Sequence, residues 1–385
     1  MPHVRTEELV TGAEAFRHSH YGALHSQAAF LLLVGRQLRG DDAAWKALAQ
    51  PLFAAPVEAA VGEDLEQFPV PSVRPTGERF HSERITSNLT RRYGRRIPKR
   101  IAPVKEFTAL AEPLADLAER FRQAPSPLAA AELMGACLRH PHELVRVAGA
   151  ASSVPVTFDV RYLLRLLQTG AKSDDPLVRA LAATALGRLA PDDPVLRRLV
   201  RPGARAAGSA PAHTSLIVHG TWARSSPWWQ PGGDFHTYLL NNVAPDLYNA
   251  ADAFAWSGGY SDAARLLGAE DLVAWANAHA AQGLNLYAHS HGGNVAFLAT
   301  HGGLTIGELV LLSCSVRIPQ YVPDFAQTNK VVSIRVHLDL VILVDGAGQH
   351  FPFPQIHEHV LPIWFDHFAT HDPAVWQEHN VPGML

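Results

Sequence analysis

Residues 284–293 read LNLYAHSHGG and place a serine between a strand pattern and a helix pattern. The apolar start of this stretch favours a buried strand, and residues 294–298, NVAFL, favour a helix. The turn between them is so tight that the positions two before and two after the serine can carry almost no side chain. Ala288 and Gly292 meet that requirement. The sequence therefore predicts a strand–turn–helix unit that lifts Ser290 Oγ clear of a sheet.

Such a turn is typical of a nucleophilic serine, with a plain glycine-rich turn as the alternative. The N–H of His291 and the positive end of the following helix would point at one place, where an oxyanion could form. Upstream, the apolar run 215–218 ends in His219-Gly220, where a second oxyanion donor is expected. A late Asp and a late His also follow the serine in the order that a catalytic triad on such a turn requires.

Length and composition limit the classes of protein. A chain of 385 residues is expected to form two or three domains, and 47% apolar residues suffice for a large core. The formal net charge of −3 argues against general nucleic-acid binding, and two cysteines are too few for a disulfide framework. The first residues lack the apolar core of a signal peptide, and the longest clean apolar run there, 28–34, is too short to span a membrane. We therefore expect a cytoplasmic protein.

Residues 203–213, GARAAGSAPAH, separate two halves of different pattern and predict a linker. Before it, the pattern is helical. The segments 142–148 and 175–182 are similar at a spacing of 33 residues, and Asp175-Pro176 is a good helix start. This periodicity resembles HEAT repeats, with a plain helical bundle as the alternative. We expect a helical region at 1–110, HEAT-like helices at 111–202, and a second domain at 214–385.

The segment 84–105 of the N-terminal region is rich in Arg and Lys and contains no acid after residue 84. Such a segment could bind RNA or phosphate groups. Because the whole chain is slightly acidic, a solvated connection, or a strap on an acidic face of the same protein, is the better interpretation.

The C-terminal half alternates between apolar strand patterns and helix patterns. The expected strands are 215–218, 253–256, 284–287, 308–312, 331–336 and 360–365, and the expected helices include 235–248 and 263–281. Continuous apolar strands separated by helices favour a doubly wound, mostly parallel sheet covered on both faces.

The C-terminal half, residues 214–385, resembles the α/β-hydrolase superfamily in its compact lipase/esterase form. The resemblance rests on HGTW at 219–222, AHSHGG at 288–293, an Asp after the penultimate strand and a His after the last one. It implies a sheet of about six strands with little room for a lid. It also implies that the backbone N–H groups of Thr221 and His291 form the oxyanion hole, with Trp222 as the alternative to Thr221.

The acid and the base of the triad are expected after the last two strands. Asp339 follows the strand 331–336 and is the expected acid, with Asp345 as the alternative. His367 lies in the loop between the last strand and the helix that begins at Asp372, so it is the expected base, with His371 as the alternative. The late histidines lack an acidic or Cys partner at metal-ligand spacing, so neither a metal nor another cofactor is expected.

Aromatic residues follow the first two expected strands of this half. They could line a pocket for an acyl or alcohol group, or they could cover the edge of the sheet. They are Trp222, Trp228, Trp229, Trp256 and Tyr260.

The expected function is a serine hydrolase that cleaves a small-molecule carboxylic ester through an acyl-enzyme on Ser290. An acyltransferase, cyclase or thioesterase would use the same triad. A third hypothesis is an interaction protein that binds a protein partner through its HEAT-like half and keeps the hydrolase half as a scaffold.

Overall fold

The computed structural model describes residues 23–40, 114–124, 126–140, 142–156, 159–200, 215–281 and 283–385. The basic segment 84–105 and the linker 203–213 lie outside these residues. The described chain forms two units, a helical one that extends to Leu186 and an α/β one from Gly187 onward. No helix in the described residues is long and apolar enough to cross a membrane.

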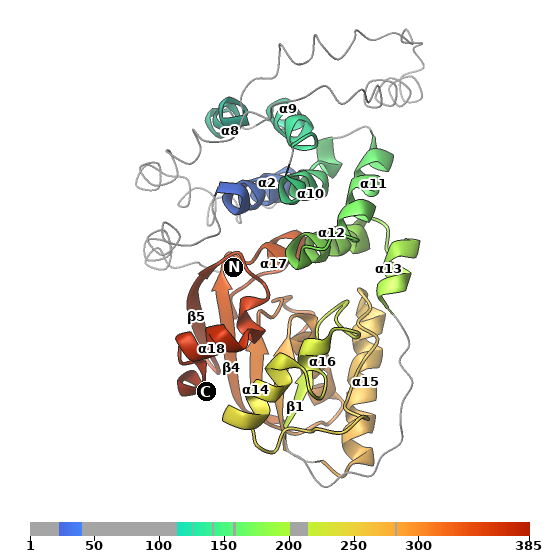
Figure 1. Cartoon of the computed structure of the whole chain (residues 1–385), viewed down its shortest axis with the longest axis vertical. Coiled ribbons are helices and arrows are strands. Elements are labelled where there is room, and N and C mark those ends of the chain that lie inside the picture. Colours follow the sequence, from blue (N-terminus) through green and yellow to red (C-terminus); the bar gives the residue numbers. More distant parts are fainter. Residues whose placement is uncertain are drawn as a thin grey trace. The chain divides into compact units, whose positions relative to one another are not determined.

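The helical unit consists of short helices that begin at polar caps. The Asp175 side chain accepts from Leu177 N and caps a helix as its sequence predicts, and the Asp159 side chain caps another by accepting from Tyr162 N. The apolar residues Leu144, Val147 and Ala148 of the first similar segment are buried. The helices are α2 (Ala23–Leu38), α8 (Leu114–Gln123), α9 (Pro127–Cys137), α10 (Glu143–Ser152), α11 (Val160–Gly170) and α12 (Pro176–Leu189), of which the last extends into the second unit (Figure 1).

The α/β unit is built on a five-stranded sheet in which all neighbouring strands are parallel, in the order β1-β2-β3-β4-β5. The expectation of an α/β fold with a parallel sheet is therefore confirmed. Within the sheet, Ala288 pairs with Val218 on one side and Leu311 on the other. The strands are β1 (Ser215–Val218), β2 (Leu284–His289), β3 (Ile306–Leu312), β4 (Thr328–His337) and β5 (Ile356–Trp364).

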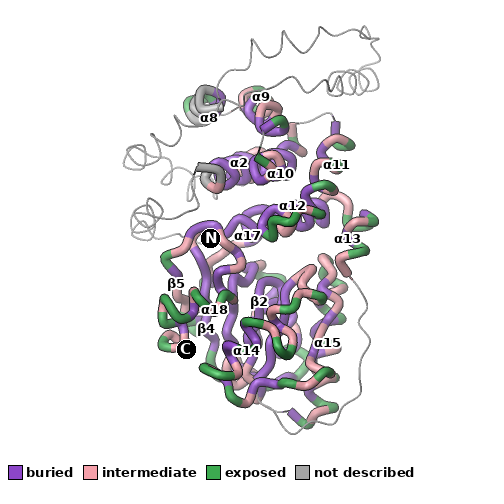
Figure 2. The backbone as a smooth tube through the Cα atoms, in the orientation of Figure 1, coloured by how far each residue is buried: buried purple, intermediate pink, exposed green. Residues whose placement is uncertain are grey.

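Alternate residues of the strands enter two separate apolar clusters, one on each face of the sheet. Leu286 packs with helix α15 (Asp262–Ala278) and helix α16 (His291–His301), whereas Tyr287 packs with helix α14 (Asp234–Asn242) and helix α18 (Pro373–Glu378). Strands β2 and β4 are accordingly buried over most of their lengths (Figure 2). Both faces are covered, which explains the continuous apolar runs in the sequence.

The expected strand at 253–256 is wrong, and the sheet has five strands rather than about six. The segment forms no strand, and the carbonyls of Ala255 and Trp256 accept hydrogen bonds from Arg224 Nη1 instead of from a neighbouring strand. The last strand begins at Ile356, earlier than expected, and carries Pro362 at the edge of the sheet, where no further strand needs its missing N–H.

Candidate active site

Backbone strain gathers at the carboxyl ends of the strands. Five of the seven non-glycine residues with positive φ in the described chain follow a strand of the sheet: Trp222, Ser290, Ser313, Leu338 and Phe365, one for each strand. Such conformations cost about 1–3 kcal/mol each and cluster at functional sites. Ligands of open parallel sheets also bind at this edge. The carboxyl edge is therefore the candidate site.

Ser290 occupies the sharp turn between β2 and α16 with φ 53° and ψ −130°. The helix that follows starts against the end of β1, because a Cβ on Gly292 would meet the Val218 carbonyl oxygen and lie 2.8 Å from that of His219. Ala288, on the other side of the serine, is fully buried. The requirement for small residues at positions 288 and 292 thus follows from close backbone packing.

Two backbone N–H groups beside Ser290 are available as oxyanion donors. His291 is the first residue of α16, so its N–H has no acceptor one turn earlier in the helix. Thr221 N forms no hydrogen bond within the described chain, and it follows Gly220, where a Cβ would lie 2.8 Å from Ser290 Cβ. The N–H of Trp222, by contrast, donates to the Gly258 carbonyl. The geometry therefore favours Thr221 over Trp222.

Asp339 and His367 are in direct contact, although they are 28 residues apart in sequence. His367 Nδ1 lies 2.7 Å from Asp339 Oδ2, and both side chains are almost completely buried. A carboxylate only accepts, so Nδ1 carries the proton of this hydrogen bond, and Nε2 is the nitrogen left for a substrate or a nucleophile. Asp339 Oδ1 accepts from the N–H groups of Val341 and Ile342 at the start of helix α17 (Leu340–Asp345). The pair has the geometry of an acid that orients a base.

The structure links this pair to the serine turn through His289. His289 Nε2 donates to the His367 carbonyl over 3.2 Å, and the two rings lie 4.7 Å apart between centroids. Ser290 Oγ forms no hydrogen bond with His367 within the described chain. Catalytic hydrogen bonds are often long in the absence of substrate and shorten when it binds.

Neither alternative, Asp345 for the acid or His371 for the base, forms the hydrogen bond that joins Asp339 and His367. Asp345 contacts His291, Arg317 and Tyr260 instead of His367. His371 stacks on Trp228 with ring centroids 4.0 Å apart. Burial, together with the nearby His367, lowers the pKa of His371 to about 3, so its imidazole is neutral.

The aromatic residues divide into two groups. Trp229 and Trp256 are buried, and their indole N–H groups donate to the carbonyls of Ala223 and His219, so they hold loops in place. Trp228 is partly exposed and stacks on His371, and Trp222, also partly exposed, stacks on Tyr260. Trp222 and Trp228 are therefore the partly exposed tryptophans of the set.

Three buried imidazoles surround the serine turn besides that of His367. Burial lowers the pKa of His219 to about 4, and burial with the neighbouring histidines lowers that of His289 well below its usual value. His291 is buried too. No group of three or more metal-ligating side chains occurs in the described residues. The contact of the His291 side chain with Asp345 was not expected, because the two residues are remote in sequence.

Comparison with family models, with curated proteins and with solved structures finds no match for this chain. The function is therefore inferred from the geometry of the site.

Proposed function

We propose that the α/β unit is a serine hydrolase of the α/β-hydrolase type and that it cleaves a carboxylic ester. The observation that carries this proposal is the buried His367–Asp339 hydrogen bond at the same sheet edge as the strained Ser290. A buried carboxylate on Nδ1 leaves Nε2 to take a proton, which a serine hydroxyl needs in order to act as a nucleophile at neutral pH.

In this mechanism Ser290 Oγ attacks the ester carbonyl and gives its proton to His367 Nε2. The resulting oxyanion is held by the backbone N–H groups of Thr221 and His291. The C–O bond of the ester then breaks, and the imidazolium protonates the departing alcohol. Water, activated by the same histidine, releases the acid from the acyl-enzyme. Asp339 stabilises the imidazolium in both halves of the reaction.

The same residues would also serve an acyltransferase, a cyclase or a thioesterase, in which the acceptor or the leaving group differs. A further proposal concerns the helical unit, whose helices α10 and α12 reproduce the 33-residue spacing. We propose that these helices form HEAT-like packing that binds a protein partner. If the site were inactive, this binding would be the function of the whole chain.

Turnover of short p-nitrophenyl esters tests the proposal. The wild-type chain should hydrolyse them, and Ser290→Ala should lower kcat by about 10⁵-fold or more, as the loss of a triad nucleophile does. Ser313→Ala is the matched control, because Ser313 is buried with positive φ at the end of the neighbouring strand and has no assigned role. Equal turnover by wild type and Ser290→Ala would overturn the proposal. Reaction with a fluorophosphonate but no ester turnover would favour acyl transfer.

A further inference from the structure

Helix α17 carries a buried carboxylate at each end. Asp339 caps its N-terminus, and Asp345 is its last residue, followed by Gly346 in a left-handed conformation with φ 76°. Every residue from Leu340 to Asp345 is buried. A six-residue helix is about 9 Å long. One short, fixed element therefore holds two carboxylates at a set separation, and Asp339 is the one that binds His367.

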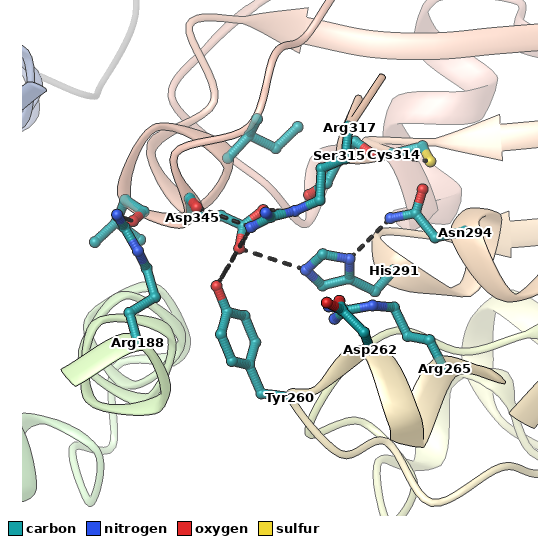
Figure 3. A network of polar contacts seen from close by, with 12 residues as sticks. Arg188, Tyr260, Asp262, Arg265, His291, Asn294, Cys314, Ser315, Arg317 and Asp345 are labelled. Atoms are coloured by element: carbon teal, nitrogen blue, oxygen red, sulfur yellow. Dashed lines mark hydrogen bonds and ion pairs between the residues drawn. The ribbon is translucent and has the colours of Figure 1, made fainter. Parts of the chain in front are cut away.

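The second carboxylate lies in a network around the side chain of His291, the residue after the candidate nucleophile (Figure 3). Asp345 Oδ1 lies 3.5 Å from His291 Nε2 and 2.6 Å from Arg317 Nη2. Arg317 Nε donates to Asp345 Oδ2 over 3.2 Å, and Tyr260 donates its hydroxyl proton to Asp345 Oδ1. Four groups from different parts of the unit thus meet at one buried position.

The ring of His291 is held on both sides. Its Nδ1 lies 2.9 Å from the amide nitrogen of Asn294, which can only donate. With the amide in this orientation, Nδ1 accepts and the proton is on Nε2, which faces Asp345. The ring of Tyr260 meets the imidazole edge-on with centroids 5.7 Å apart. The side chain therefore has little freedom to turn.

The charges of the network match this arrangement. Burial would raise the pKa of the Asp345 carboxyl, but His291 and Arg317 hold that pKa far below its usual range. Burial lowers the pKa of His291 despite the opposing effect of Asp345. The result is an ionised carboxylate balanced by the Arg317 guanidinium, with a neutral imidazole beside them. Both ring nitrogens of His291 are engaged, so it is poorly suited to accept a proton from Ser290.

We propose that His291 is a positioning residue: the Asp345–Arg317 pair holds its side chain so that its backbone N–H stays aimed at the oxyanion of the reaction proposed above. Ser290 has a strained conformation, and such a conformation persists only where its surroundings over-determine it. A displacement of about 1 Å at an oxyanion donor can cost on the order of 100-fold in rate. Helix α17 then orients the base with Asp339 and the oxyanion donor with Asp345.

The test compares His291→Leu with His291→Gln. Leu removes both polar contacts at similar volume, whereas the Gln amide can still donate to Asp345. We expect kcat to fall about 10- to 100-fold in His291→Leu while KM stays within about twofold, and the Gln variant to recover most of the loss. The affinity for a trifluoromethyl ketone, whose adduct carries an oxyanion, should fall by the same factor as kcat.

The matched control is Tyr321→Phe. Tyr321 belongs to a neighbouring network, in which its buried hydroxyl group contacts Arg265 Nε over 2.9 Å and the exposed Asp262 Oδ1 over 2.5 Å. This variant should lose thermal stability while kcat and ketone affinity stay normal. If His291→Leu does not fold, Tyr260→Phe takes its place, because Phe keeps the ring stacking and removes the hydroxyl group from Asp345. We then expect a loss of about threefold in kcat and in ketone affinity together.

Normal kcat and normal ketone affinity in a folded His291→Leu variant, or in Tyr260→Phe where the Leu variant does not fold, would overturn the inference. A loss that Tyr321→Phe reproduces would overturn it too, since the effect would then follow stability. The inference rests on the proposed function, and its own failure is recognisable. A wild-type enzyme that depends on Ser290, with His291→Leu unimpaired, contradicts the positioning role alone. A wild type without Ser290-dependent activity contradicts both.

Discussion

Asp339 and Asp345, the two carboxylates of helix α17, are both buried and both lie near an imidazole. They differ in the groups that balance their negative charge. Asp339 is stabilised by two backbone N–H groups at the helix N-terminus and by His367, and no Lys or Arg contacts it within the described chain. Asp345 is bound by Arg317 at 2.6 Å. A carboxylate without a cation can stabilise a proton gained by its imidazole, whereas one already neutralised can do so only weakly. This difference favours Asp339 over Asp345 as the acid of the proposed triad.

The largest expected effect distinguishes His367, the proposed base, from its alternative His371. His367→Ala should lower kcat by about 10⁵-fold or more, close to the loss of the nucleophile itself, because the triad acts as a unit. His371→Ala removes a neutral ring stacked on Trp228 and should cost about 10-fold or less. Steady-state kinetics on both purified variants decides between them. A larger loss of kcat in His371→Ala than in His367→Ala would identify His371 as the base.

The next comparison exchanges each carboxylate for its amide. Asp339→Asn should lower kcat on the order of 10⁴-fold while the fold is retained, because the amide can favour the wrong tautomer of His367. Asp345→Asn should lower kcat only about 10- to 100-fold, since it acts through the backbone of His291. Circular dichroism confirms folding, and initial rates give kcat. Equal losses in the two variants would remove the distinction drawn between the ends of α17.

The third comparison removes the Arg317 guanidinium and measures the effect on stability. Arg317→Met leaves Asp345 buried without a countercharge and should lower the free energy of unfolding by about 3 kcal/mol. The double variant Arg317→Met/Asp345→Leu should regain part of that loss, because no charge then remains to be paired. Urea unfolding of Arg317→Met, of Asp345→Leu and of the double variant measures the coupling energy between the two side chains. If the stability losses of the two single variants add up to that of the double variant, Arg317 and Asp345 are not energetically coupled.

The smallest effect concerns pH. The pKa of His371 is lowered to about 3 by burial and by His367, so below the usual histidine pKa near 6.5 the unfolded chain takes up a proton that the folded chain refuses. Stability is then complete above about pH 6.5 and falls as the pH decreases toward 3, with a cost of about 2 kcal/mol at pH 5 from this one histidine. His371→Phe keeps the stack on Trp228 and should lose less stability between pH 8 and pH 5 than wild type does. An identical fall in both would show that His371 does not titrate on unfolding.

The sequence was sufficient to predict that three candidate residues lie just after strands of one sheet. Ser290, Asp339 and His367 each follow a strand of a parallel sheet, and parallel strands bring their carboxyl ends to one edge. The strand expected at 253–256 was wrong because a single remote side chain, that of Arg224, takes two of its carbonyls. No local pattern announces such a contact.

The second network could not be predicted for the same reason. Arg317 and Asp345 are 28 residues apart, and Tyr260 and Asp345 are 85 apart. The run 341–344 suggested only that Asp345 ends an apolar segment, which left it as a rival acid. Only the folded structure shows that Asp345 contacts Arg317 and His291, whereas Asp339 contacts His367.

The most direct measurement identifies the residue that a fluorophosphonate modifies. The wild-type protein is treated with the reagent, digested, and the modified peptide is sequenced by mass spectrometry, with Ser290→Ala and Asp339→Asn treated in parallel. We expect a single phosphonylated residue, Ser290, no adduct in Ser290→Ala, and much slower labelling in Asp339→Asn. An adduct on another residue, or equal labelling of wild type and Ser290→Ala, would contradict it.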